Sequence, residues 1–528
     1  MFSPIDIEVT NKLLTAVAEE MGIVLQKSAF SPNIKERRDF SCAVFDKDGR
    51  LLAQAAHIPV HLGAMPLTVA EILKRFTLGP EDVVITNDPF KGGTHLPDIT
   101  IMKGVYLRGC DHPSFYLLAR AHHADIGGVT PGSMPLATHI DQEGVLIPPS
   151  LLIKDGNMNE DFLSALLEKV RNPRERQGDL RAQLACIRRG EERLRAAVYR
   201  QGVSAFLDRI DPLLDYGERI ICSILNRLPE GDFEFEDFMD DDGLDEQPVP
   251  IRVRLSLNGQ QAVVDFSNSA PQVKTGINTV RSVTCSAVYY CFFCLVGQEY
   301  PINQGTLRPI KVITRPGTIL DAAYPAPVAA GNVETSQRIV DCLLGAMSKA
   351  MPDRIPAASC GSMNNISVGG CPTGGHSFAY YETIGGGMGG GPGQPGLSGV
   401  QVHMTNTLNT PIEALEQEYP LLVERYALRT GSGGQGQYPG GDGIVRRYRF
   451  LSQATVTLLT ERRRIGPYGL KGGLPGEKGR NLFFPDNRED PEILPGKIHL
   501  DVMPGDVLEI QTPGGGGWGQ PDVKKFRH

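Results

Sequence analysis

Residues 115–125 read FYLLARAHHAD, an apolar run that leads directly into two histidines and an aspartate. A short apolar run of this length predicts a buried β-strand over 115–123. A second such run, at 82–86, ends in the tripeptide NDP at 87–89. The first quarter of the chain is therefore expected to contain strands whose ends carry polar clusters.

Helical and strand-like patterns are mixed along the chain. Apolar spacing predicts an opening helix over 5–30, and an Asp-Gly turn between 40–45 and 51–53 indicates a β-hairpin. The segment 155–227 is strongly helical and highly charged, which favours a surface-facing or subunit-bridging helical arm. After about residue 433, short β-like runs alternate with glycine turns, which indicates an antiparallel sheet.

These patterns predict a mixed α+β fold with several lobes, because 528 residues are too many for one compact core. The expected division is a metal-site lobe at 1–150, a helical arm at 151–230, a mixed α/β second lobe at 231–432 and a β-rich C-terminal segment at 433–528. Polar clusters that carry chemistry are expected in the first of these.

Composition argues against several classes of function. The net charge of −8 comes from acidic and basic residues mixed throughout, so there is no cationic stripe for a nucleic-acid backbone and no polybasic membrane anchor. No apolar stretch is long and charge-free enough to span a bilayer. Ten cysteines are few for this length, and the N-terminus lacks the basic and apolar regions of a secretion signal. We expect a cytoplasmic protein without nucleic-acid or membrane partners.

Sixty glycines and 39 prolines gather in short clusters between apolar segments, which predicts many tight, ordered loops. The runs GGGMGGG from residue 385 and GGGGWG from residue 514 lack the Lys-Ser/Thr ending of a phosphate loop. They could be lids, subunit contacts or simple turns. A nucleotide site on this chain is not expected from them.

Three polar clusters in the first quarter of the chain bring histidine and carboxylate side chains. They are RRD at 37–39, HLPD at 95–98 and HHAD at 122–125. This mixture of ligands suits zinc, manganese or iron. On a strand, His123 and Asp125 would share one face and His122 the other, so only one of the adjacent histidines is expected to be a direct ligand. Each residue could also be an ordinary hydrogen-bonded side chain or cap, since the clusters form no contiguous metal motif.

Several segments resemble signatures of the hydantoinase B/oxoprolinase family. They include ERRDFSCAVFD at 36–46, HIPVHLGAMP at 57–66, NDPFKGGTHLPD at 87–98, AHHADIGGVTPGSMP at 121–135 and, further on, GNVETSQRIVD, SGGQGQYPGG and TPGGGGWGQP. The resemblance covers essentially the whole chain. Members of the family include subunits of N-methylhydantoinase, 5-oxoprolinase, caprolactamase, and acetone and acetophenone carboxylases.

The resemblance implies a divalent metal ion, zinc, manganese or iron. Its ligands would be an aspartate, the His-x-x-Asp pair and one histidine of the His-His cluster. Carried over by motif, these are Asp39, His95, Asp98 and either His122 or His123, and His123 is assigned here as the ligand.

The other polar residues of these motifs are candidates for catalysis. His122 or Asp125 could be the general base, or could orient the group that is. Asn87 and Asp88 could shape the same pocket, although an Asn-Asp-Pro turn needs such residues for its own hydrogen bonds. The assigned catalytic set is therefore His122, Asp125, Asn87 and Asp88.

Two further groups have alternative roles. Arg37 and Arg38 could bind a phosphorylated oxygen, because the guanidinium fork matches phosphate geometry, or could pair with Glu36 or another carboxylate. Glu334, where a helix is expected to begin, could cap that helix or face the pocket. The residues alone leave these alternatives open.

The resemblance also implies an activity and a partner. The chain would be the metal-binding catalytic subunit of an ATP-dependent cyclic-amide hydrolase, attacking a carbonyl that a partner subunit has phosphorylated. ATP would be bound by an actin-like subunit of the hydantoinase A type, in a heterotetramer or larger complex. The alternatives are a subunit of an acetone- or acetophenone-type carboxylase, and a non-catalytic scaffold for the ATPase subunit.

Overall fold

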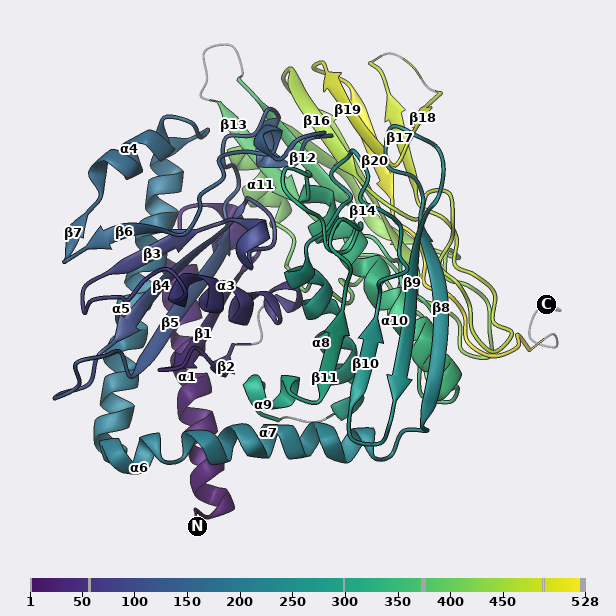
Figure 1. Ribbon diagram of the computed structural model, residues 1–528. Coiled ribbons are helices and arrows are strands. Elements are labelled where there is room, and N and C mark those ends of the chain that lie inside the picture. Colours follow the sequence, from purple (N-terminus) through teal and green to yellow (C-terminus); the bar gives the residue numbers. More distant parts are fainter. Residues whose placement is uncertain are drawn as a thin grey trace.

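Figure 1 shows the computed structural model, which describes residues 2–55, 58–297, 300–371, 377–486, 488 and 490–522. In these ranges the strands form four sheets, and helices pack against and between them. The mixed α+β class predicted from the sequence is confirmed. None of the helices in these ranges has both the length and the apolar character that a membrane crossing requires.

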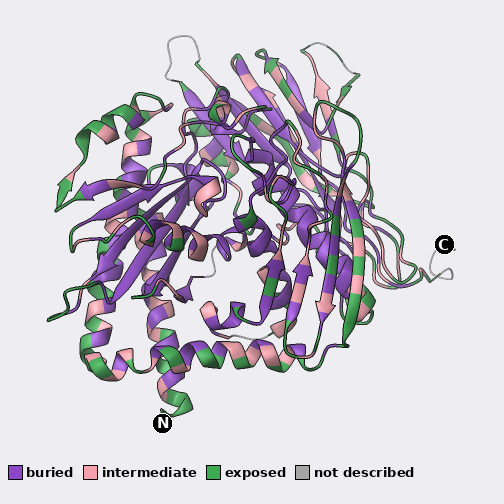
Figure 2. Ribbon diagram, viewed as in Figure 1, coloured by how far each residue is buried: buried purple, intermediate pink, exposed green. Residues whose placement is uncertain are grey.

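The N-terminal lobe is built on a seven-stranded antiparallel sheet with the order β2-β1-β5-β4-β3-β6-β7. Its strands are β1 (Phe40–Asp46), β2 (Leu51–Gln54), β3 (Val83–Thr86), β4 (Asp98–Val105), β5 (Phe115–His122), β6 (Ser150–Lys154) and β7 (Asn157–Met158). The central strands β4 and β5 are buried along their whole length (Figure 2). Because both faces of the sheet are covered, the apolar run of β5 is continuous rather than alternating.

One face of this sheet is covered by α1 (Pro4–Ser28) and α5 (Pro173–Gln201), which pack against each other. At their crossing, Gly190 of α5 lies against Met21 of α1 and Leu117 of β5, and an added Cβ would come within 2.5 Å of the Met21 sulfur. The structure therefore makes α5 a layer of the N-terminal lobe rather than an arm. Most of its charged residues are exposed or half-buried, although Arg176, Asp179 and Glu191 are buried, and its apolar residues cover the sheet. An exposed arm would show a similar pattern in the sequence.

The opposite face of the sheet is covered by α3 (Ala64–Leu73). Val69 and Ile72 of this helix belong to one buried cluster with Phe45 and Leu118 of the strands. The remaining helices of this half are α2 (Pro32–Lys35), α4 (Glu160–Leu167), α6 (Val203–Leu207) and α7 (Ile210–Leu225). Figure 1 shows α7 running along the base of the molecule from α6 toward the next lobe.

The middle lobe contains a four-stranded sheet with the order β11-β10-β9-β8. Its elements are β8 (Gly231–Met239), β9 (Val249–Leu257), β10 (Ala262–Asp265), α8 (Arg281–Val296), α9 (Gln304–Leu307), β11 (Ile310–Ile313) and α10 (Ser336–Ala350). Helix α10 packs on β8, β9 and α8. One turn of π-helix, η5 (Gly331–Thr335), leads directly into α10. Such turns are frequent at functional sites.

Two further antiparallel sheets complete the fold, as the glycine-punctuated pattern near the C-terminus predicted. One has the order β13-β12-β16-β19 and the other β14-β15-β20-β17-β18. Their elements are β12 (Asn365–Gly370), β13 (Phe378–Glu382), α11 (Ile412–Glu418), β14 (Leu421–Arg429), β15 (Gly443–Phe450), β16 (Ala454–Leu459), β17 (Arg480–Phe484), β18 (Glu492–Leu494), β19 (Lys497–Val502) and β20 (Val507–Gln511). Because β12 pairs with β16, the boundary expected near residue 433 runs through a sheet.

The glycine-rich runs form a bundle of extended segments, residues 385–396, 431–443, 466–476 and 512–519, which hydrogen-bond through their backbones. Gly390 N–H donates to the carbonyl of Gly516 at 2.8 Å, for example, and Gly434 N–H donates to that of Gly515 at 2.8 Å. A Cβ added at Gly389 would lie 1.8 Å from a backbone oxygen. The runs are thus packed against one another, and their glycines are required because the backbones approach too closely for side chains.

Glu143 joins the N-terminal lobe to the helix that carries η5. Its Oε1 accepts hydrogen bonds from the backbone N–H groups of Val328 and Ala329, both at 2.9 Å, immediately before that helix. The side chain is fully buried, and burial raises its pKa to about 8 even though the two hydrogen bonds favour the charged form.

We expect Gly389→Ala to destabilise the protein by about 1–3 kcal/mol or more, because its Cβ would overlap a backbone oxygen that cannot move away independently. The matched control is Gly391→Ala in the same segment, whose Cβ would meet only Pro356 at 3.5 Å. Thermal unfolding of the two variants checks this. Equal melting temperatures for the two variants would contradict the close backbone packing described for this bundle.

Glu143 predicts a specific pH dependence of stability. Its pKa is about 8 in the folded protein and near 4.5 in the unfolded chain, so its contribution to stability is full below pH 4.5 and is lost as the pH rises toward 8. Glu143→Gln keeps the neutral shape, so the melting temperature should fall less between pH 5 and pH 8 than in the wild type. Parallel pH profiles for the two proteins would disprove this.

Candidate active site

The antiparallel register of three strands brings the polar clusters to one end of the N-terminal sheet. Asp98, the first residue of β4, pairs with His122, the last residue of β5. On the other side of β5, Phe40 pairs with Ala121, and the backbone N–H of His122 donates to the carbonyl of Asp39 at 3.0 Å. Residues far apart in the sequence therefore meet at one end of the neighbouring strands β1, β5 and β4.

A small buried cavity lies at this end of the strands, between the N-terminal lobe and the later part of the chain. The N-terminal lobe contributes Asp39, Ile58, Val60, His61, His95, Asp98 and His122, and the opposite wall consists of Asn332, Val333, Met363, Tyr381, Thr383, Met404 and Thr405. Its volume is about 20 Å³. That is room for a single ion or water molecule.

Several buried polar atoms at this cavity have no hydrogen-bond partner among the described residues: both ring nitrogens of His95, Oδ1 of Asp98 and Nε2 of His122. Each such atom costs about 1–3 kcal/mol when buried unsatisfied, so their gathering in one place indicates a ligand that the chain itself does not supply. Nε2 of His95 stands 3.8 Å from Oδ1 of Asp98. The rings of His95 and His122 lie 5.0 Å apart.

These donors fit a metal ion in chemistry, but they are not yet at the spacing that an ion requires. Two ligands of a tetrahedral zinc ion lie roughly 3.3 Å apart, somewhat closer than the His95–Asp98 pair. As they stand, the described side chains include no group of three or more His, Cys, Asp or Glu residues already close enough to surround an ion. For the His95–Asp98 pair, binding therefore requires a contraction of about half an ångström.

The second oxygen of Asp98 is already engaged. Oδ2 accepts a hydrogen bond from His61 Nε2 at 3.2 Å and another from the hydroxyl of Thr94. His61 is itself oriented by Ser41, whose hydroxyl lies 2.9 Å from Nδ1. These bonds direct the free oxygen, Oδ1, toward His95. His61 was not predicted as a site residue, although it lies in the 57–66 segment that carries the family resemblance; His57 of that segment falls outside the described residues.

His122 is held on two sides. The amide of Asn33 lies 3.1 Å from its Nδ1, and the ring of Tyr381 stacks on the imidazole with centroids 4.7 Å apart and planes within 12°. With Nδ1 engaged, Nε2 is the ring nitrogen left for the cavity. Supporting bonds of this kind fix the orientation of a ligating histidine.

His123 and Asp125 are not brought to the cavity. Nε2 of His123 lies 3.0 Å from Oε1 of Gln183 on α5, so this ring faces the covering helix. Asp125 accepts from the backbone N–H of Gly127 and from Arg171, and so holds the loop that follows β5. Alternation correctly puts the two histidines on opposite faces, but the sequence did not show which face carries the cavity, and β5 ends before Asp125.

Asn87 and Asp88 brace the loop that carries His95 and do not line the cavity. The Asn87 amide donates to the carbonyls of Leu96 at 2.8 Å and Val145 at 2.9 Å. Asp88 accepts from the backbone N–H of Phe90 at 2.9 Å. Of the two roles considered for these residues, the structure shows the local hydrogen bonds.

Arg37 ties the two walls of the cavity together. Its buried guanidinium donates to the carbonyl of Tyr381 at 3.2 Å and to the hydroxyl of Thr383 at 3.0 Å, and lies 3.9 Å from Asp39 Oδ2. Arg37 therefore connects the two walls and pairs with Asp39, and its guanidinium is not exposed for binding a phosphate group. Arg38, by contrast, is exposed.

Glu334 lies behind Tyr381 on the later wall. Its Oε1 accepts from the amide of Asn365 at 2.9 Å, and Asn365 Oδ1 in turn accepts from the Tyr381 hydroxyl at 2.6 Å. Burial raises the pKa of Glu334 to about 8. The residue thus supports the wall, through Asn365 and through the backbone N–H of Met363, and does not itself line the cavity.

Burial also determines the charge states of the cavity residues. It lowers the pKa of His95 to about 4, against the pull of Asp98, and raises that of Asp39 to about 7, against the pull of Arg37. Burial alone would raise the pKa of Asp98 as well, but the neighbouring His95 and His61 outweigh it and hold that pKa well below its ordinary value. A neutral imidazole beside an ionised carboxylate is the form in which these groups bind metals.

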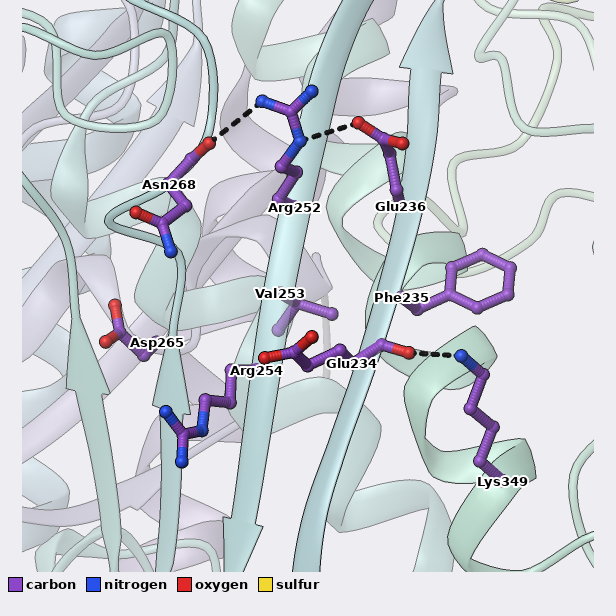
Figure 3. Close-up of a pocket in the computed structure, with 9 residues that line it drawn as sticks. All are labelled: Glu234, Phe235, Glu236, Arg252, Val253, Arg254, Asp265, Asn268 and Lys349. Atoms are coloured by element: carbon purple, nitrogen blue, oxygen red, sulfur yellow. Dashed lines mark hydrogen bonds and ion pairs between the residues drawn. The ribbon is translucent and has the colours of Figure 1, made fainter.

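A second, more open groove lies on the outer face of the middle-lobe sheet (Figure 3). Several of its charged side chains already have partners: Arg252 pairs with Glu236 at 2.6 Å, and Lys349 donates to the backbone carbonyl of Glu234 at 2.5 Å. Paired, exposed charges of this kind are typical of a solvated surface. The groove shows no convergence of unsatisfied groups, among the described residues, comparable to that in the cavity.

The model of the family described as hydantoinase B/oxoprolinase matches residues 3–521. The chain belongs to the hydantoinase B/oxoprolinase family. It is 40% identical to an uncharacterised protein of Methanocaldococcus jannaschii over 98% of this chain and 91% of that protein. A 5-oxoprolinase of Dictyostelium discoideum is 38% identical over 98% of this chain but only 40% of its own length. A protein of a Pseudomonas species, named as one subunit of a D-/L-hydantoinase, is 28% identical over 98% of this chain and 90% of that protein.

Solved structures extend the family likeness to three dimensions. The ATP-dependent caprolactamase from Pseudomonas jessenii superposes with a TM-score of 0.92 at 26% identity, covering 99% of this chain and 93% of that chain. Nucleotide-free acetone carboxylase superposes with a TM-score of 0.88 at 17% identity over 98% of this chain and 76% of that chain, which shows a shared fold. The chain spans about two fifths of the eukaryotic 5-oxoprolinases that it matches.

Proposed function

We propose that this chain is the metal-binding catalytic subunit of an ATP-dependent cyclic-amide hydrolase. The observation that carries the proposal is the meeting of Asp39, His95, Asp98 and His122 at one buried cavity, where three of them present polar atoms without partners among the described residues. The family relatives named 5-oxoprolinase and hydantoinase support the class of substrate.

Asp39, His95, Asp98 and His122 would hold a divalent ion. His122 takes the place that sequence reasoning assigned to His123, because His122 lines the cavity and His123 faces Gln183. Histidine with carboxylate accepts zinc, manganese or iron. When bound, such an ion supplies Lewis-acid polarisation and makes water a better nucleophile near neutral pH.

The chain's own residues prepare this site. His61 and Thr94 hold one oxygen of Asp98, and Asn33 and Tyr381 hold the ring of His122, so the side chains that face the cavity are fixed before anything binds. Burial keeps bulk water away from an activated intermediate, which would otherwise be hydrolysed without control. Geometry fixed in advance in this way lowers the barrier to reaction.

The amide must be activated elsewhere. Transfer of the γ-phosphoryl group of ATP to the ring carbonyl oxygen would give ADP and remove the amide resonance. Water then adds to that carbon, the ring C–N bond breaks as the nitrogen takes a proton, and hydrolysis of the resulting acyl phosphate releases phosphate and a carboxylate. We assign the first step to an actin-like ATP-binding subunit of the hydantoinase A type in a hetero-oligomer.

Two observations support a separate ATP-binding part. The Pseudomonas relative is named as one subunit of its enzyme, and in the eukaryotic 5-oxoprolinases more than half of the length lies outside the region that matches this chain. The glycine runs of this chain lack the Lys-Ser/Thr ending of a phosphate loop and are packed into the bundle.

Metal analysis tests the ligand set. We expect purified His95→Ala and Asp98→Ala to lose bound zinc, manganese or iron, and His122→Gln to bind it at least about tenfold more weakly, since each removes a donor to the ion. The matched control is His123→Gln, which keeps a partner for Gln183 and should retain the metal. A full metal content in both alanine variants, or equal loss in the two glutamine variants, contradicts the assignment.

The reaction class is tested with the chain and its ATP-binding partner together. Hydantoin, 5-oxoproline or caprolactam should stimulate ATP hydrolysis in bicarbonate-free buffer, with release of the ring-opened product measured by mass spectrometry. Turnover that requires bicarbonate and yields a carboxylated product would refute the hydrolase assignment.

A further inference from the structure

The wall opposite the metal-type residues contains one polar side chain that stands apart from the rest. Asn332 lies in η5, the single π-helical turn before α10, and is 4% exposed. Its Oδ1 has no hydrogen-bond partner in the described part of the chain. An unsatisfied amide oxygen at this depth requires a donor from outside the chain.

The other polar groups of this wall are already satisfied. The Tyr381 hydroxyl donates to Asn365 at 2.6 Å, and the Thr383 hydroxyl accepts from Arg37 at 3.0 Å. The Thr405 hydroxyl lies 3.3 Å from that of Thr407. Among the residues that line this wall, Asn332 therefore offers the free acceptor.

The position of Asn332 is fixed by its surroundings. The hydroxyl of Ser336 donates to the Asn332 carbonyl at 2.6 Å, and the Asn332 N–H donates to Val328 at 3.2 Å. Glu143 anchors the start of the same helix from the N-terminal lobe. These bonds fix the backbone of Asn332, whose side chain lines the cavity together with Asp98 and the histidines.

We propose that Oδ1 of Asn332 accepts a hydrogen bond from the N–H of the substrate's ring amide and so selects amide rings that carry a hydrogen on that nitrogen. This inference rests on the proposed function and identifies a residue that distinguishes between substrates of that enzyme. In such rings the N–H and the neighbouring C=O point to the same side, so a ring bound between the two walls with its N–H toward Asn332 presents a face of the carbonyl carbon, rather than the carbonyl oxygen, to the His95 side.

The size of the cavity sets a condition. A volume of about 20 Å³ holds an ion or a water molecule, whereas pockets for small molecules are usually about 300 Å³ or more. Ring binding therefore separates the two walls. Until then the Asn332 oxygen lies buried without its partner, and the ring N–H supplies that partner on binding.

Such a contact gives strong chemical selectivity. A site that hydrogen-bonds a substrate N–H rejects an analogue without it far more strongly than an apolar pocket rejects a missing methylene, because the buried acceptor is left unpaired. Rings methylated at the nitrogen of the bond that breaks, and lactones, lack this hydrogen. Both are therefore disfavoured because the hydrogen bond is lost, and the methylated rings are disfavoured by their size as well.

The test compares wild type with Asn332→Leu and Asn332→Ala, each assembled with the ATP-binding partner. Substrates are hydantoin, 5-oxoproline and caprolactam, each beside its derivative methylated at the nitrogen of the scissile bond. In wild type, kcat/KM should be at least about 100-fold lower for the methylated ring. In both variants, kcat/KM for the N–H ring should fall about 10- to 100-fold while that for the methylated ring changes less than about threefold, so the preference collapses.

Two readouts separate recognition from a structural role. Metal content and melting temperature of Asn332→Leu should match wild type, since an unsatisfied buried amide is replaced by an apolar group of similar size. Thr405→Val, on the same wall, should keep the N–H preference. Equal losses for both kinds of ring in the Asn332 variants, or a wild type without N–H preference, overturn the inference alone. If no cyclic amide stimulates ATP turnover in wild type, the proposed function fails, and the inference fails with it.

Discussion

The register between β4 and β5 is the constraint on which the site depends. Because Asp98 pairs with His122, and the adjoining β1 places Asp39 beside them, three segments separated along the chain end at one point. A slip of one residue would turn each side chain to the other face of the sheet, toward α5 and away from the cavity. The contacts that support the site, such as those of His61 with Asp98 and of Asn33 with His122, can form only in this register.

The cavity is stabilised as a whole although it contains unsatisfied groups. Arg37 and Glu143 each join the N-terminal lobe to the later wall through buried hydrogen bonds, and Tyr381 contributes a ring stacked on His122. These contacts offset the penalty of leaving His95, Asp98 and Asn332 without partners among the described residues. The side chains that face the cavity are held in place, so a metal ion finds its donors largely ordered, whereas a substrate ring must also separate the two walls.

Local patterns predicted the elements better than their arrangement. The opening helix, the hairpin of β1 and β2 and the strand ending at His122 follow from spacing and turn residues over a few positions. The choice between His122 and His123 as a ligand depends on which face of the sheet meets the rest of the chain. Whether α5 is an exposed arm or a covering layer depends on what its apolar stripe packs against. His61 is recognisable only through its contact with Asp98, which no local pattern encodes.

The glycine bundle places a condition on how the protein is made. Glycine loses more conformational freedom on folding than any other residue, and these segments have no side chains with which to collapse locally. Their order comes from neighbouring strands of backbone, including the one near residue 515 that hydrogen-bonds to both Gly434 and Gly441. During synthesis, the earlier glycine runs therefore remain unpaired, and this part of the protein becomes ordered only after the segment 512–519 has also emerged from the ribosome.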